Sequence, residues 1–145
     1  MSALSQALPL IKRFEGCRLA AYPDPATEGD PWTIGWGATG EGIRHGLTWT
    51  QDQADNRLLV DAARFDRQVR RYVSMPLDDH QLAALISFAF NCGVANLARS
   101  TLLRLVNLGD PKASREFLKW NRAAGQVMAG LTRRRQAEKD LFDGA

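Results

Sequence analysis

The sequence is poor in the residues that build metal centres and disulfide frameworks. It has two cysteines, Cys17 and Cys92, and two histidines, His45 and His80, among 145 residues. Two cysteines are too few for a disulfide framework, and they lack the CxxC spacing of a metal or redox motif. A single Cys17–Cys92 bridge is one alternative, but we expect reduced thiols. With so little histidine, we expect no multi-histidine metal site and no cofactor.

Long hydrophobic runs are also missing. No stretch approaches the roughly 18 apolar residues of a membrane span. The N-terminal segment MSALSQALPLIKRFEG lacks the basic region and the apolar stretch of a secretory signal. We therefore expect synthesis in the cytoplasm and no membrane span. A substrate outside the membrane would then require another route of release.

Positive charge is in only slight excess. The net charge of +3 gives a mild attraction to polyanions such as nucleic acid, acidic membranes or cell-wall polymers. A non-catalytic domain that binds nucleic acid is one alternative, and Arg133–Arg135 is its best support. Nucleic-acid-binding proteins concentrate basic residues on one reading element, whereas Glu138 and Asp140 follow this cluster closely. We expect no nucleic-acid partner.

The first third of the chain changes character near residue 16. Apolar residues at helical spacing over 4–14 predict a helix that ends before Gly16, with Pro9 in its first turn. Glycine and proline punctuate residues 18–46, which predicts a small, twisted antiparallel sheet. Its three expected strands are Arg18–Tyr22, Trp32–Gly37 and Gly42–Arg44.

The remainder of the chain is predicted to be helical. Thr50 and Gln53 form a capping box that opens a long amphipathic helix through about Val73. Asp78 and Gln81 begin the next helix, which is apolar nearly all round and therefore buried. That helix covers Leu82–Phe90 and ends at Gly93; three more are expected over 102–106, from Asp110-Pro111 through Trp120, and from Gly130 through about Phe142.

This order of elements predicts an α+β fold in one domain, residues 1–145, with two lobes. The sheet-rich lobe covers 16–50, and a connecting helix covers 51–73. The helical lobe covers 74–145 together with 1–15. We expect a monomer with the substrate between the lobes.

Three residues could combine in a hydrolytic site. Glu15 ends the first helix, Asp24 follows the first strand, and Thr33 lies in the second strand. Glycoside hydrolysis uses one carboxylic acid to protonate the leaving oxygen and a second carboxylate to stabilise the oxocarbenium-like state. A hydroxyl can hold the attacking water. Because such pairs are common, ordinary surface carboxylates are the alternative that spacing alone does not exclude.

A wider set of motifs runs in order from about Ser5 to Phe142. The set comprises Phe14-Glu15-Gly16, Arg18-Leu19, Tyr22-Pro23-Asp24, Thr33-Ile34-Gly35-Trp36-Gly37, Phe90-Asn91-Cys92-Gly93, Ser100-Thr101-Leu102-Leu103, and Gly130-Leu131 followed by Arg134-Arg135 and Ala137-Glu138. Together these motifs resemble the phage-type lysozymes of glycoside hydrolase family 24. The resemblance implies a two-lobed lysozyme-like fold. It also implies a muramidase that inverts as it hydrolyses the β-1,4 bond between N-acetylmuramic acid and N-acetylglucosamine in peptidoglycan glycan strands. Release for host cell lysis would depend on a holin-type partner.

The same resemblance implies the site residues. Glu15 corresponds to the catalytic acid, Asp24 to the second carboxylate and Thr33 to the threonine that positions water. Eight residues separate Asp24 from Thr33, more than the family usually has, so Asp30 is a second candidate carboxylate. Ala38 stands where the family has a histidine that the acid chemistry does not need, and we expect activity to survive.

Two further residues are expected to bind substrate. Asn91 could hydrogen-bond an N-acetyl group, or it could instead cap a helix. Arg134 corresponds to a family arginine that pairs with Glu15, and Arg133 takes that place if the register shifts. The rival functions are a lytic transglycosylase, which forms an anhydro product without water, and a non-catalytic wall-binding module.

Overall fold

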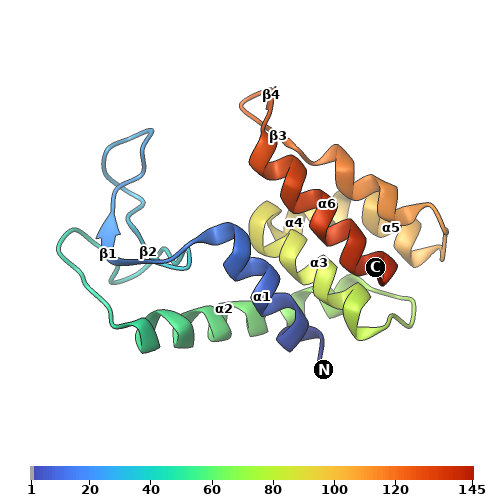
Figure 1. Ribbon diagram of the computed structural model, residues 1–145, viewed down its shortest axis with the longest axis horizontal. Helices are drawn as coiled ribbons and strands as arrows, with labels where there is room; N and C mark the ends of the chain where they lie inside the picture. The colour runs from blue at the N-terminus through green and yellow to red at the C-terminus, as the bar shows by residue number, and fades with distance from the viewer. Residues whose placement is uncertain (1) are drawn as a thin grey trace. The chain divides into compact units, whose positions relative to one another are not determined.

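The computed structural model describes residues 2–145 and shows an α+β fold (Figure 1). Its elements are α1 (Ala3–Glu15), β1 (Arg18–Tyr22), β2 (Thr33–Gly35), α2 (Gln51–Tyr72), α3 (Asp79–Cys92), α4 (Val94–Arg99), α5 (Thr101–Asn107), the 3-10 helix η1 (Ala113–Lys119), β3 (Arg122–Ala123), β4 (Gln126–Val127) and α6 (Ala129–Asp143). None of the helices formed by residues 2–145 combines the length and apolar character of a transmembrane segment.

The chain divides into two compact units. Glu15–Asp61 is called the sheet unit here, and Met1–Phe14 with Ala62–Ala145 the helical unit. One boundary falls inside α2 and the other falls directly before Glu15. Glu15 therefore belongs to the same compact unit as Asp24 and Thr33.

The sheet unit contains one short antiparallel pair. β1 pairs with β2 so that Arg18 lies opposite Gly35 and Tyr22 opposite Thr33, and the register shifts between these two pairs. The predicted strand at 42–44 is wrong, since this segment leaves a turn at Gly42, which has φ 81°, and then has no regular secondary structure. In place of the expected third strand, a residue further along the chain pairs with β1: Thr48 forms an isolated bridge to Ala20.

The core of the sheet unit is small and depends on the first half of α2. Ile34, Ala38 and Ile43 are buried, and Ala21, Trp32, Leu47 and Trp49 pack against them. So few strands bury too little apolar surface to be stable alone. The indole N–H of Trp36 donates to the carboxylate of Asp55 at 2.8 Å, which ties the β2 turn to α2.

The helical unit is built around α3, which is buried continuously from Leu82 to Ala89. The prediction of an all-round apolar, buried helix is confirmed. Figure 1 shows α6 beside α3, and η1 packs against α6. The Phe88 ring meets Phe117 and Trp120 edge-on, with centroids 5.9 Å and 5.3 Å away, geometries that stabilise an aromatic core.

The predicted helix starts are confirmed where their signals are local. The Thr50 amide donates to Gln53 Oε1 at 2.8 Å, and the Gln53 amide donates to Thr50 Oγ1 at 3.2 Å. The Asp78 amide donates to Gln81 Oε1 at 2.9 Å. Gly93, at φ 91°, is the C-cap of α3 as expected.

Some predictions that depended on packing are wrong. Pro9 lies inside α1 and not in its first turn, because buried Ala3 and Ala7 extend the helix backwards. The segment after Pro111 forms the 3-10 helix η1 and not an α-helix. The β3–β4 hairpin was not expected. Its turn residues are Ala124 and Gly125, both at positive φ, and alanine is not a typical residue for that position.

Candidate active site

Glu15 is the last residue of α1 and is partly buried. One of its carboxylate oxygens, Oε2, lies 3.3 Å from the position that a Cβ atom on Gly37 would occupy. Gly37 has φ 96°, a conformation that glycine adopts without strain. The carboxylate therefore packs against a stretch of backbone that has no side chain.

The segment against which the Glu15 carboxylate packs is a tight turn after β2. Ile34 and Ala38 exchange two backbone hydrogen bonds, at 3.0 Å and 2.8 Å, and enclose Gly35 and Gly37. Gly35 also has positive φ, and a Cβ there would be 3.0 Å from the Trp49 ring. Thr33 directly precedes this turn. The structure thus brings the Glu15 carboxylate to the turn that directly follows Thr33.

Asp24 lies two residues beyond the Tyr22–Thr33 pair, at the end of β1. Its Oδ1 accepts a hydrogen bond from the Ala26 amide at 2.7 Å, and its backbone amide donates to the Gly29 carbonyl at 3.0 Å. The side chain is partly buried. Asp24 therefore organises the loop that connects β1 to β2 and lies at the Thr33 end of the strand pair.

Asp30, the second candidate carboxylate, is exposed at the other end of this loop. Its backbone carbonyl accepts the Thr27 hydroxyl at 2.7 Å. This contact fixes the backbone of Asp30 and leaves its carboxylate out of the loop's hydrogen bonding.

The helical unit holds a buried polar cluster, defined as Ser87, Arg134, Arg135 and Glu138. Glu138 Oε1 lies 2.7 Å from Arg135 Nε, and Glu138 Oε2 accepts hydrogen bonds from Ser87 Oγ at 2.6 Å and Arg134 Nε at 3.3 Å. Burial raises the pKa of Glu138, and the two guanidinium groups and the Ser87 hydrogen bond oppose that rise. Glu138 belongs to one of the sequence motifs but had no predicted role; its spacing of four residues from Arg134 is the signal in the sequence that could have indicated this pair.

Asn91 is exposed in the last turn of α3. Its Oδ1 accepts a hydrogen bond from Arg135 Nη2 at 3.0 Å. The alternative role as a helix cap is wrong, because Gly93 is the cap residue. The adjacent Cys92 is a free thiol that accepts from Arg135 Nη1 at 2.7 Å, and Cys17 is also free.

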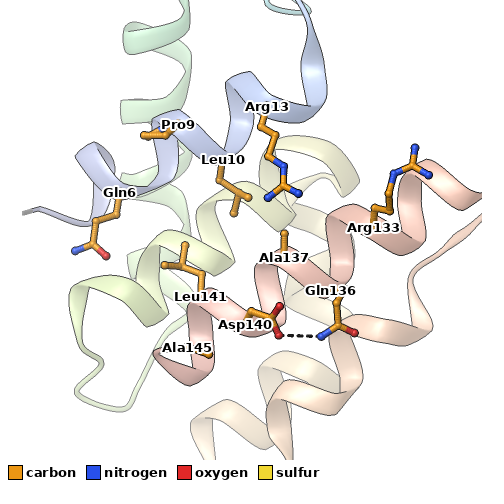
Figure 2. A pocket seen from close by; sticks show the side chains of 10 residues that line it. All are labelled: Gln6, Pro9, Leu10, Arg13, Arg133, Gln136, Ala137, Asp140, Leu141 and Ala145. Carbon is orange, nitrogen blue, oxygen red and sulfur yellow. Dashed lines mark hydrogen bonds between the residues drawn. The ribbon is translucent and has the colours of Figure 1, made fainter.

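Arg133 and Arg134 have different surroundings although they are adjacent. Arg133 is exposed and lines an open pocket of about 560 Å³ between α1 and α6, which Arg13, Gln136 and Asp140 also line (Figure 2). Arg134 is buried, and its Cζ lies 5.9 Å from the ring centre of Phe14. Of the two candidates, it is Arg134 that contacts the residue before Glu15.

Comparison with known families and sequences gives consistent matches. The family model described as phage lysozyme matches residues 12–138. An endolysin of Acyrthosiphon pisum secondary endosymbiont phage 1 is 39% identical, and the match covers 100% of both chains. An endolysin of Bacillus phage B103 is 40% identical over 96% of this chain and 53% of its own length. The chain thus spans about half of that relative.

Solved structures share the fold. The muramidase domain of SpmX from Asticaccaulis excentricus has a TM-score of 0.85 at 38% identity, and the match covers 94% of this chain and 93% of that one. An endolysin from the Escherichia coli phage FAHEc1 has a TM-score of 0.86 at 30% identity, covering 100% and 96%. The expected lysozyme-like α+β fold is confirmed.

Proposed function

Since this chain belongs to the phage lysozyme family, we propose that it hydrolyses the β-1,4 bond between N-acetylmuramic acid and N-acetylglucosamine in bacterial peptidoglycan. The family consists of glycosidases that lyse the bacterial cell wall. The relatives named above are endolysins and a muramidase domain, which supports this bond as the target and host cell lysis as the purpose.

Glu15 is the proposed general acid. The observation that carries the proposal is the packing of its carboxylate against Gly37, in the turn that directly follows Thr33. A carboxylic acid held there by backbone contact can protonate the glycosidic oxygen as the bond breaks. The Thr33 hydroxyl is the proposed ligand of the water that completes hydrolysis.

Asp24 is the proposed second carboxylate, which stabilises the oxocarbenium-like state and activates the water. We prefer it to Asp30 because it is partly buried at the Thr33 end of the strand pair. An inverting enzyme needs about 6.5–9.5 Å between its carboxyl groups to admit the water. We propose inversion. An NMR time course on a soluble glycan should then show the α-anomer as the first product.

Asn91 and Arg134 are the proposed substrate-binding residues. Asn91 is exposed and carries an amide that can pair with an N-acetyl group. Arg134 is held beside Phe14 and supplies positive charge next to the residue that precedes the acid.

Release of soluble fragments from purified sacculi tests the activity. E15Q keeps the shape of the side chain but removes the proton, and a general acid contributes about 10²–10⁴-fold to the rate. We expect E15Q to lose at least about 100-fold, D24N to lose much of the activity and D30N to lose little. Equal loss in D24N and D30N would contradict the assignment of Asp24. Products lighter by one water would indicate a lytic transglycosylase.

We also propose that the protein is made in the host cytoplasm and reaches the wall through a holin-type pore-forming partner. Expression in host cells with and without such a pore tests this route. Lysis is expected only when both are present, and lysis without the pore would refute the dependence.

A further inference from the structure

Three charged side chains are buried together in the helical unit. Arg135 and Glu138 have no exposed surface, and Arg134 is 3% exposed. Apolar residues of similar volume usually stabilise such a position as well or better. Fold stability is therefore an insufficient reason for this arrangement.

The Glu138 carboxylate fixes both arginines from the same helix. Its Oε1 contacts Arg135 Nε at 2.7 Å, and its Oε2 accepts from Arg134 Nε at 3.3 Å and from Arg135 Nη2 at 3.1 Å. Ser87 on α3 donates its hydroxyl to Oε2 at 2.6 Å. Three hydrogen bonds to Oε2, together with an ion-pair contact at Oε1 that lacks hydrogen-bond geometry, orient the carboxylate against the two guanidinium groups.

Arg135 connects the buried polar cluster to Asn91. Its Nη2 donates to Asn91 Oδ1 at 3.0 Å. A guanidinium has donors only, so the amide must turn its oxygen toward Arg135 and its NH₂ group away. Because Asn91 is exposed, the side chain presents hydrogen-bond donors outside the cluster.

We propose that Arg135 and Glu138 are positioning residues that fix Asn91 as a hydrogen-bond donor to a carbonyl oxygen of the substrate. Within the proposed function, on which this inference depends, the carbonyl belongs to the acetamido group of an N-acetyl sugar. Glu138 orients Arg135, and Arg135 orients the Asn91 amide. Neither buried residue touches the substrate.

A double-mutant cycle between Arg135 and Asn91 tests the proposal. R135K keeps a positive charge beside Glu138 but loses the planar fork that reaches Asn91. All variants carry E15Q so that binding is measured without turnover, with an N-acetylglucosamine oligosaccharide as the probe in titration calorimetry. N91A and R135K should each weaken binding about three- to tenfold, the size of one hydrogen bond.

The coupling between the two changes decides the outcome. If Arg135 acts through Asn91, R135K has no further effect once Asn91 is alanine. If the two losses multiply, Arg135 acts elsewhere and the proposal is overturned. In the otherwise wild-type enzyme, N91A and R135K should raise KM and leave kcat nearly unchanged. If the variants instead lost only structure, a smaller fraction of the protein would be active, and the apparent kcat would fall.

E138Q extends the test to the carboxylate. We expect it to weaken probe binding to the same degree as R135K. The matched control is D143N, which removes one partner of the Lys139–Asp143 pair at the end of the same helix and should bind normally. If E138Q folds and binds the probe normally, Glu138 does not position Arg135 and that part of the proposal is refuted. If E138Q does not fold, the cycle between Arg135 and Asn91 still decides.

Failure of this inference can be told apart from failure of the proposed function. Wild-type protein that releases no fragments from sacculi refutes the function. Wild-type protein that is active, with multiplicative losses in the cycle, refutes only the positioning role.

Discussion

Substitution of Gly37 by alanine tests whether the position of the Glu15 carboxylate limits the reaction. Gly37 has φ 96°, and a Cβ there would lie 3.3 Å from Glu15 Oε2. This distance is shorter than ordinary van der Waals contact, so the carboxylate must retreat by a few tenths of an ångström. G37A should therefore strain the backbone and displace the proposed acid together.

The two effects have different magnitudes and can be separated. A side chain at positive φ costs roughly 1–2 kcal/mol, which for a domain of this size lowers Tm by about 3–8 °C. Displacement of a reacting group by 1 Å can cost about 10²-fold in rate. A shift of a few tenths should cost about three- to tenfold in kcat.

G46A is the matched control. Gly46 has φ 88°, in the same unit, and a Cβ there would meet nothing within 4 Å. Both variants should lose similar stability in thermal unfolding, but only G37A should lose kcat in the sacculus assay. If G46A loses as much kcat as G37A at equal folded fraction, the contact with Glu15 does not control the reaction.

Two further predictions concern groups in the helical unit with shifted pKa. Burial raises the pKa of the Cys92 thiol although Arg135 opposes the rise, so less thiolate is present at pH 8. In a C17S variant, iodoacetamide should then label Cys92 more slowly than a free cysteine, and equal or faster labelling would contradict the burial of this thiol. Partial burial raises the pKa of Asp143, but hydrogen bonds from Lys139 and Ser114 outweigh this effect and lower it overall. A carboxyl group with a lowered folded pKa stabilises the fold above its unfolded pKa and loses that effect as the pH falls through the folded value. The urea midpoints of wild type and D143N should differ slightly at pH 7 and converge in acid, and a difference that grows on acidification would show the opposite sign.

Local signals in the sequence were sufficient to predict most of the helices. The capping boxes at Thr50 and Asp78 need only residues three positions apart, so their hydrogen bonds follow from the sequence itself. The apolar character of α3 on all sides predicted its burial in the same way. By contrast, the turn at Gly42 and the 3-10 geometry of η1 depend on what the chain packs against. Their local sequences fit more than one backbone path.

The family, the α+β class and the candidates Glu15, Asp24 and Thr33 could be predicted from the sequence, because these depend on residue types in a fixed order. The contacts between particular atoms could not be predicted and come from the folded chain. Glu15 packs on Gly37, 22 positions away, Glu138 accepts from Ser87, 51 positions away, and Arg135 reaches Asn91 across 44 positions. Contacts at such separations are set by helix and strand packing over the whole unit, and no local pattern in the chain encodes them.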